Sequence, residues 1–229
     1  KKNDLKPWRR LMWCIGELTD EYRSRMYALL ALYAKPRSRA EPVVCIDEKS
    51  LQLIGHSRAP LRMASHSPEK VDYEYVRNGT TNLFVAVEPK AGQRIVAVTA
   101  RRGKVDFVEF VSNLLRNTYA KARRVHLVLD NLNTHFRKCF EDVLGKHAAA
   151  KLLRRVQFHY TPKHASWLNM AEIEIGILTR QCLDRRTATQ DLLKSEVAAW
   201  QLDRNKEART INWKFTRQDA DAKLSRHYV

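Results

Sequence analysis

Val125-His126-Leu127-Val128-Leu129 runs directly into Asp130-Asn131, and these seven residues are the most informative about the fold. A short run rich in apolar and β-branched residues is typical of a strand that is buried on both faces. Residues 43–46 (VVCI) have the same character and are followed at once by Asp47. Since sites in open α/β sheets form beyond the carboxyl ends of strands, the two patterns predict buried strands that each bring one acid to the same edge of a sheet.

The rest of the chain supplies partners for these two strands. Alternating or apolar runs predict further strands over 73–76, 82–88, 94–100 and 156–160, with a turn at the Asn78-Gly79 pair. Apolar residues at helical spacing predict helices over 105–120, 136–144, 166–183 and 188–204. A hairpin meander followed by strand–helix units predicts an α/β fold, with a mixed sheet flanked by helices.

The first 39 residues form a separate, basic segment. Tyr22, Met26 and Tyr33 recur at 3- to 4-residue steps or multiples of them, as on one helix face, and Thr19 is a candidate N-cap. Pro36 ends this helical pattern. We therefore expect a basic helical arm or linker over residues 1–39 and one α/β domain over residues 40–229.

The charge of the chain points to its partner. The sequence holds 42 Lys and Arg against 25 Asp and Glu, a formal net charge of +17. A folded domain with such an excess usually faces a polyanion, so we expect it to bind nucleic acid. No apolar run approaches the roughly 20 residues of a membrane span, and no membrane partner is expected. The four cysteines are isolated and lack zinc-site spacing, and free thiols fit a reducing cytoplasm.

Asp47 and Asp130 are candidates for binding divalent cations. Mg²⁺ prefers oxygen ligands and is usually held by one or two carboxylates together with substrate phosphates. The predicted helix after the next strand carries two further acids, Glu172 and Glu174, in a run that is apolar on nearly every face. Two residues on a helix correspond to about 200° of rotation. Only one of these acids is therefore expected to face the cations, and periodicity does not choose between them.

Four segments, in this order, resemble one known family. They are VVCIDEK at 43–49, RNGTTNLF at 77–84, LVLDNLNTH at 127–135 and YTPKHASWLNMAE at 160–172. Together they are similar to the catalytic domain of bacterial insertion-sequence transposases of the Tc/mariner superfamily, the DDE type. The resemblance implies a ribonuclease H-like fold over residues 40–229, with Asp47, Asp130 and Glu172 as the catalytic, metal-binding acids. The spacing from Asp130 to Glu172 is longer than is usual in mariner relatives, and we expect the excess as a longer connection near residues 147–155.

The resemblance also implies the chemistry and the partners. The cofactors would be two Mg²⁺ ions, with Mn²⁺ able to substitute, and the partner would be DNA, both transposon ends and target. The activity would be phosphodiester cleavage at the ends followed by strand transfer, by a homodimer in the synaptic complex, in the bacterial cytoplasm at the nucleoid. Family members carry helix-turn-helix domains ahead of the catalytic domain, and the residues before Asp47 do not read as a full recognition module.

Other residues complete the expected site. Those expected to bind DNA are Lys49, Lys163, His164, Arg123 and Arg124. Asn131 and His135 are expected to support Asp130 through hydrogen bonds. Glu48 directly follows Asp47 and should point to the other face of a strand, so we expect no part for it in catalysis. Two other functions stay open: another ribonuclease H-like nuclease, and a truncated copy that binds DNA without cutting it.

Overall fold

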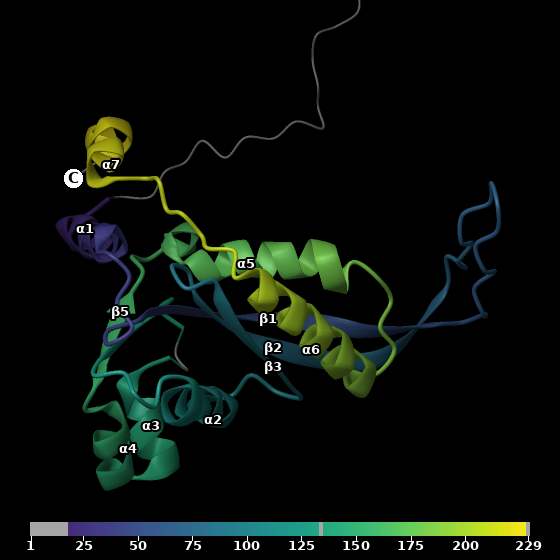
Figure 1. Cartoon of the computed structure of the whole chain (residues 1–229), viewed down its shortest axis with the longest axis horizontal. Helices are drawn as coiled ribbons and strands as arrows, with labels where there is room; N and C mark the ends of the chain where they lie inside the picture. Colours follow the sequence, from purple (N-terminus) through teal and green to yellow (C-terminus); the bar gives the residue numbers. More distant parts are fainter. Residues whose placement is uncertain (1–17, 133–134, 228–229) are drawn as a thin grey trace, which may run out of the picture.

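A five-stranded mixed sheet forms the centre of the computed structural model, which describes residues 18–132 and 135–227 (Figure 1). The strands are β1 (Val43–His56), β2 (Tyr75–Glu88), β3 (Gln93–Thr99), β4 (Val125–Leu129) and β5 (Val156–Tyr160). Their order across the sheet is β3-β2-β1-β4-β5. β1, β2 and β3 pair antiparallel, whereas β4 pairs parallel with both β1 and β5. The predicted α/β class and mixed sheet are confirmed.

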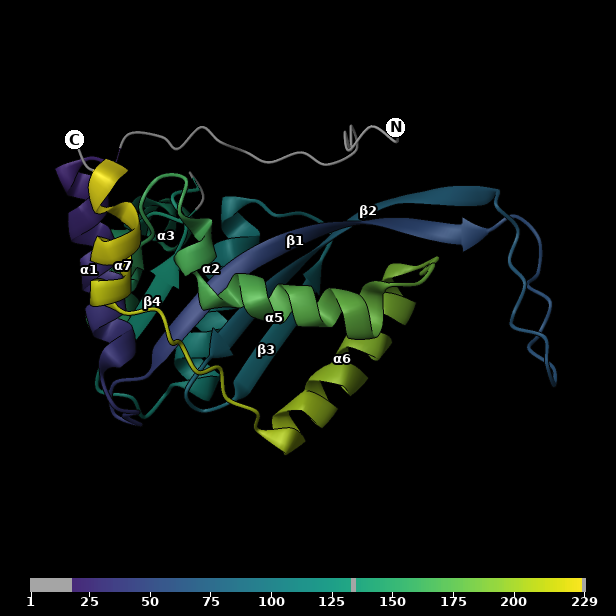
Figure 2. The same ribbon diagram turned by 90° about the horizontal axis from the view of Figure 1, so that it is seen from above.

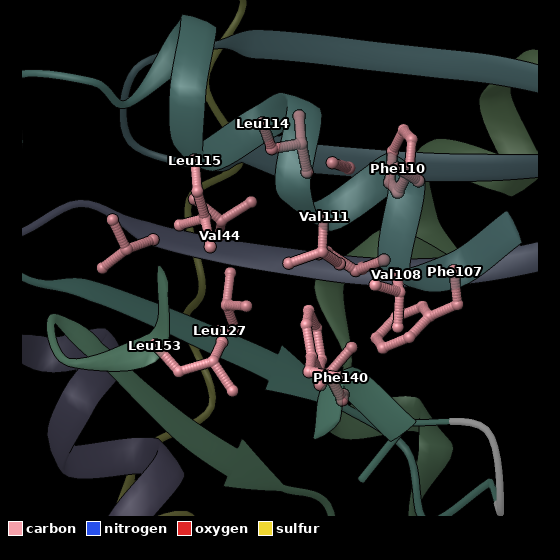
Figure 3. Packing of buried hydrophobic residues seen from close by; sticks show 14 of the residues in the cluster. Val44, Phe107, Val108, Phe110, Val111, Leu114, Leu115, Leu127, Phe140 and Leu153 are labelled. Carbon is pink, nitrogen blue, oxygen red and sulfur yellow. The ribbon is translucent and has the colours of Figure 1, made fainter. Parts of the chain in front are cut away.

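Helices cover both faces of this sheet. In the described part of the chain they are α1 (Asp20–Ala34), α2 (Lys104–Asn113), α3 (Arg137–Leu144), α4 (Lys146–Leu153), α5 (Met170–Leu178), α6 (Gln190–Glu207) and α7 (Arg217–Leu224). Alternate residues of a strand point to opposite faces. Val44 and Leu127 accordingly pack with α2, α3 and α4 (Figure 3), whereas Cys45 and Val128 pack with α1, α5 and α7. α6 packs with α5 and the β2 residue Val85 on this second face.

β1 is much longer than the strand predicted over residues 43–46. Its pairing with β4 stops at Cys45, but its ladder with β2 continues to His56. The expectation that Asp47 directly ends a strand is therefore wrong, because β2 satisfies the backbone of β1 well beyond this point. Asp47 lies within β1, just past the place where pairing with β4 ends. The apolar run marks the part of β1 that has neighbouring strands on both sides.

The Asn78-Gly79 pair does not form the predicted turn. A register shift between Gln52 and Ile54 leaves the β1 residue Leu53 opposite this pair, and Gly79 adopts a φ of 92°. Two residues facing one make a β-bulge, which uses the positive φ that glycine accepts without strain. The same sequence signal thus serves a bulge inside β2. The chain reverses instead across residues 57–74, which project beyond the body of the molecule (Figure 2).

α1 lies in the segment expected to be an arm, and α4 lies where a longer connection was expected. The Thr19 hydroxyl accepts a hydrogen bond from the Tyr22 N–H (3.2 Å), so Thr19 is the N-cap of α1 as predicted. Met26 and Tyr33 of α1 are buried in the core, while residues 1–17 of the expected arm lie outside the described residues. The connection expected near residues 147–155 is largely helical, because α4 buries Leu153 against the sheet. No helix formed by the described residues is long and apolar enough to cross a membrane.

Candidate active site

Asp47 and Asp130 reach the same level of the sheet from neighbouring strands. Parallel pairing places Cys45 opposite Val128, so the two aspartates, each two residues further on, come level with one another. A step of two residues returns a strand to the same face, which here is the face that α1 and α5 cover. Asp47 is 9% exposed, whereas the Asp130 side chain is 33% exposed. The fold thus brings the two acids together at the end of the parallel part of the sheet.

The first turn of α5 is tied to β1 beside Asp47. Asn169 is the N-cap of α5: its Oδ1 accepts from a backbone N–H of that turn (3.2 Å), and its Nδ2 donates to the Ile46 carbonyl oxygen (2.9 Å). A cap of this kind fixes the start of a helix. Glu172 lies in the same turn with an exposed side chain. The helix start predicted at residue 166 is instead a separate 3-10 turn, Ser166–Leu168.

The pKa of Asp47 responds to the other two acids. Burial raises the pKa of Asp47, and the charges of Glu172 and Asp130 raise it further, to about 7. A hydrogen bond from the Glu48 backbone N–H (2.8 Å) works in the opposite direction without cancelling these effects. Carboxylates that share a site repel one another in this way, and a nearby cation reverses the shift. The arrangement therefore favours a positive charge beside Asp47.

The acid cluster fits a divalent cation of the Mg²⁺ type. Its donors are carboxylates, the hard oxygen ligands that Mg²⁺ and Mn²⁺ prefer. Within the described residues, no three His, Cys, Asp or Glu side chains are arranged to hold one ion by themselves. Mg²⁺ usually takes one or two protein carboxylates and completes its shell with water and substrate phosphate. Asp47 and Asp130 suit that role as a level pair, and Glu172 adds a third negative charge.

His135 links Asp130 to a residue on the other face of the sheet. Its Nδ1 lies 2.6 Å from Asp130 Oδ1, which also accepts from the Leu132 N–H (3.2 Å). Its Nε2 lies 2.9 Å from Glu48 Oε2, in an ion pair whose N–H is poorly aligned for a hydrogen bond. Burial opposes a charge on His135, but the two carboxylates outweigh it and raise the pKa of His135 to about 9. Burial raises the pKa of Asp130, but contact with His135 outweighs burial and lowers this pKa, which favours the ionised carboxylate.

Glu174, the other acid of α5, is held in a buried ionic network. Its Oε1 accepts from Arg94 Nε (2.8 Å) and Arg204 Nη2 (3.3 Å), and its Oε2 accepts from Arg94 Nη2 (3.2 Å). The side chains of Glu174 and Arg94 are both fully buried. A carboxylate that two guanidinium groups already hold is poorly placed to bind a cation. The geometry therefore favours Glu172, the acid that the resemblance implied.

A basic groove runs from Asp130 toward α1. The hollow beside Asp130 is lined by Asn131, Lys163 and His164, and an adjoining hollow shares these three and adds Arg25, which pairs with Glu21 of the same hollow (Nη2–Oε1 2.6 Å). Asn131 accepts from Arg25 Nη1 (3.0 Å) and donates to a backbone carbonyl after β5, rather than to Asp130. His164 has a φ of 62°, a left-handed conformation that costs a non-glycine residue roughly 1 kcal/mol or more. The surrounding loop thus holds an exposed histidine in a strained position on the groove.

The other residues expected to bind DNA lie in different places. Lys49 is two residues beyond Asp47 on the same face of β1. Arg123 and Arg124 are exposed but precede β4, at the opposite end of that strand from Asp130. Arg123 also pairs with Glu41 (2.7 Å). The structure therefore brings Lys49, but neither of these arginines, to the acids.

A comparison of the chain with known families settles its class. Residues 42–194 match the family described as DDE superfamily endonuclease. The chain belongs to the DDE superfamily endonucleases. The matched span covers more than half of the chain and contains all three acids, so the DDE type expected from the four sequence segments is confirmed. No curated protein matches the chain.

Solved structures of the mariner transposase Mos1 share the fold. The Mos1 paired end complex with Mg is 16% identical with a TM-score of 0.59, over 96% of this chain and 67% of that one. The paired end complex with Mn is 15% identical with a TM-score of 0.57, over 88% of this chain and 61% of that one. The catalytic domain of Mos1 is 11% identical with a TM-score of 0.55, over 88% of this chain and 96% of that one. The predicted ribonuclease H-like fold is confirmed, and the chain spans about three fifths of the length of the protein in the Mn complex.

Three residues at the site were given no role in it from the sequence. Glu48 was expected to point away from Asp47, which it does, but it contacts His135 on the far side of the sheet. Arg25 lies in the segment expected to be an arm, yet it lines the groove. Asn169 precedes an apolar helical run, and an Asn in that position is a recognised N-cap signal. That signal would have placed the start of α5 correctly.

Proposed function

We propose that the chain is the catalytic domain of a DNA transposase, which cuts phosphodiester bonds at transposon ends and joins the freed ends to target DNA. The proposal rests above all on the level pair Asp47 and Asp130, with Glu172 beside them and a basic groove alongside. Membership of the DDE endonucleases supports a phosphoryl-transfer reaction. The net charge of +17 supports a polyanionic substrate.

Each acid has a defined part in this reaction. Asp47, Asp130 and Glu172 would hold two divalent cations, Mg²⁺ or Mn²⁺. When bound, such a pair activates the attacking oxygen and stabilises the leaving oxygen of an in-line displacement at phosphorus. The protein contributes positioning and charge, as in other phosphoryl transfers. His135 holds one oxygen of Asp130, and Asn169 holds the turn of α5 that carries Glu172.

The same acids serve two successive displacements. In the first, the oxygen of a water forms a bond to phosphorus and the bond to the 3′ oxygen breaks, which leaves a 3′-hydroxyl and a 5′-phosphate. In the second, that 3′-hydroxyl oxygen attacks a phosphodiester of the target and displaces a target 3′ oxygen. The second step exchanges one phosphodiester for another and needs no external source of energy.

The groove lined by Arg25, Lys163 and His164 suits the sugar-phosphate backbone next to the bond that is cut. Contacts to phosphates fix the register of the DNA without reading its sequence, and they weaken as salt rises. We further propose that the chain works as a homodimer, since joining two transposon ends requires two copies of the site. The recognition of end sequences is not assigned to any residue of this chain.

The proposal is tested with purified chain, supercoiled plasmid, and Mg²⁺, Mn²⁺ or EDTA. Nicking and end-joining should require metal, disappear in Asp130→Asn, and persist in Asp142→Asn, which changes an exposed aspartate paired with Lys104 (2.9 Å). Sequencing of joined products distinguishes strand transfer from simple hydrolysis. Equal activity in wild type and Asp130→Asn would overturn the assignment of the acids. DNA binding by an intact but inert wild type would favour a non-cutting DNA binder.

A further inference from the structure

The surroundings of Glu48 do not explain why a carboxylate is buried there. Its side chain is 4% exposed, on the face of the sheet opposite to Asp47. Its Oε1 has no hydrogen-bond partner among the described residues, and its Oε2 meets the Nε2 of His135 at 2.9 Å. A buried carboxylate with incomplete hydrogen bonding costs stability, and an apolar side chain of similar volume in such a place is often as stable or more so. Stability alone therefore does not account for Glu48.

Through His135, the charge of Glu48 reaches Asp130. The ring of His135 is fully buried and packs on Phe107, with ring centroids 4.5 Å apart. Its two nitrogens each contact a carboxylate oxygen, Asp130 Oδ1 at 2.6 Å and Glu48 Oε2 at 2.9 Å. At Nδ1 the ring meets Asp130 in a hydrogen bond, and at Nε2 it meets Glu48 in an ion pair, so contacts at both ends hold the ring orientation.

Asp130 is held by one of its two oxygens. Within the described chain, both hydrogen bonds of the carboxylate, from His135 and from the Leu132 N–H, end on Oδ1. The side chain is nevertheless 33% exposed, beside the hollow that Lys163 and His164 line. Because both hydrogen bonds hold Asp130 through Oδ1, its Oδ2 stays available for a ligand from the groove.

We propose that Glu48 is a positioning residue of the acid site, which fixes His135 so that Asp130 is presented to the divalent cation in one orientation. The proposal rests on the proposed function, because it takes Asp130 as a metal ligand. Residues that orient metal ligands from behind typically change metal affinity by 10- to 100-fold. Because Glu48 lies on the far face of β1, it would affect the reaction through His135 and Asp130, without contact with substrate or metal.

The test measures Mn²⁺ binding to the whole chain without DNA, by electron paramagnetic resonance of the free ion. Glu48→Met keeps the approximate volume but cannot accept a hydrogen bond, and it should weaken Mn²⁺ binding about tenfold or more. Glu48→Gln keeps an acceptor but no charge, and it should lie between Glu48→Met and wild type. Glu109→Gln, at an exposed position on α2, is the matched control and should bind as wild type. Asp130→Asn should bind far more weakly than any of these variants.

Two further measurements separate positioning from a merely structural role. The thermal unfolding midpoint of Glu48→Met should stay within a few degrees of wild type. In a His135→Gln background, Glu48→Met should cause no further loss of Mn²⁺ affinity, because residues that act through one another are not additive. If Glu48→Met proves unfolded, the intermediate affinity of Glu48→Gln carries the test.

The possible outcomes distinguish the two proposals. Wild-type affinity in both Glu48 variants, or an undiminished effect in the His135→Gln background, would overturn the positioning role and leave the proposed function standing. Absence of Mn²⁺ binding by wild type, or equal binding by wild type and Asp130→Asn, would overturn the metal site of the proposed function and the positioning role with it.

Discussion

Glu172 and Glu174 stand two residues apart in α5, and the protein surrounds them differently. Glu174 is fully buried between Arg94 and Arg204, whereas Glu172 is exposed in the first turn and raises the pKa of Asp47. Two residues turn a helix by about 200°. One acid therefore faces β3 and α6, and the other faces the acid edge of the sheet. Partners, rather than residue type, therefore decide whether an acid supports the fold or stays free for chemistry.

The buried network also determines where α5 lies. Arg94 donates to Glu174 and to the backbone carbonyls of Gly92 and Arg209, so it joins α5 to β3 and to the segment after α6. Removal of one member of such a network leaves an uncompensated buried charge, which is strongly destabilising. The position of Glu172 over the sheet thus depends on a neighbour that takes no part in the chemistry.

The largest effect is expected from Glu172→Gln. Loss of a metal ligand should cost more than the roughly 100-fold that loss of a ligand's supporting partner costs, so metal-dependent plasmid cleavage should fall by more than about 100-fold. Because the side chain is exposed, the free energy of unfolding should stay within about 0.5 kcal/mol of wild type. Denaturant unfolding and a cleavage time course on the same preparation check both. Near-normal cleavage would remove Glu172 from the site.

Glu174→Gln, the matched substitution, should act on stability instead. It leaves Arg94 and Arg204 without their buried counter-charge, which should cost about 3–5 kcal/mol. For a chain of this size, that corresponds to a fall in Tm of roughly 10 °C, measurable by circular dichroism. The folded protein should still cleave DNA well below its Tm. An unchanged Tm with lost cleavage would reverse the roles of the two glutamates and make Glu174 the third acid.

The contrast also shows which features of the fold and of the site could be predicted from the sequence. The buried parts of β1 and β4 that precede Asp47 and Asp130 were predictable because a buried strand is a local apolar pattern. The full length of β1 was not, because its extension depends on pairing with β2, a contact between distant residues. The choice between Glu172 and Glu174 was equally beyond periodicity. The helix is apolar on nearly every face, and the arginines that bury Glu174 come from β3 and α6; the family resemblance made that choice.

The contact between Glu48 and His135 was hidden for a related reason. Alternation along β1 correctly places Glu48 on the face opposite to Asp47. It says nothing of a loop residue that follows another strand and enters the core on that face, as His135 does. Local patterns thus predict which way a side chain points, while long-range packing determines what it meets.

Asn169→Ala should produce the smallest effect and connects the two regions. The change removes the N-cap of α5 and its bond to the Ile46 carbonyl oxygen, which should cost about 1–2 kcal/mol. Because the first turn of α5 is then free to shift, cleavage should also fall about tenfold, as small misplacements of reacting groups do. The matched control is Thr189→Ala, which removes the N-cap of α6, a bond from the Leu192 N–H (3.2 Å).

Thr189→Ala should lower the free energy of unfolding by about 1 kcal/mol and should cleave DNA as well as wild type. Both variants are measured by denaturant unfolding and by plasmid cleavage at a temperature where each is fully folded. If Asn169→Ala cleaves as well as Thr189→Ala, the bond from α5 to β1 does not position Glu172. The contrast between Glu172 and Glu174 would then rest on burial alone, with α5 held by the network around Glu174 and by its apolar packing. If cleavage falls in Asn169→Ala alone, the exposed acid has its own anchor on the sheet, independent of the network that holds its buried neighbour.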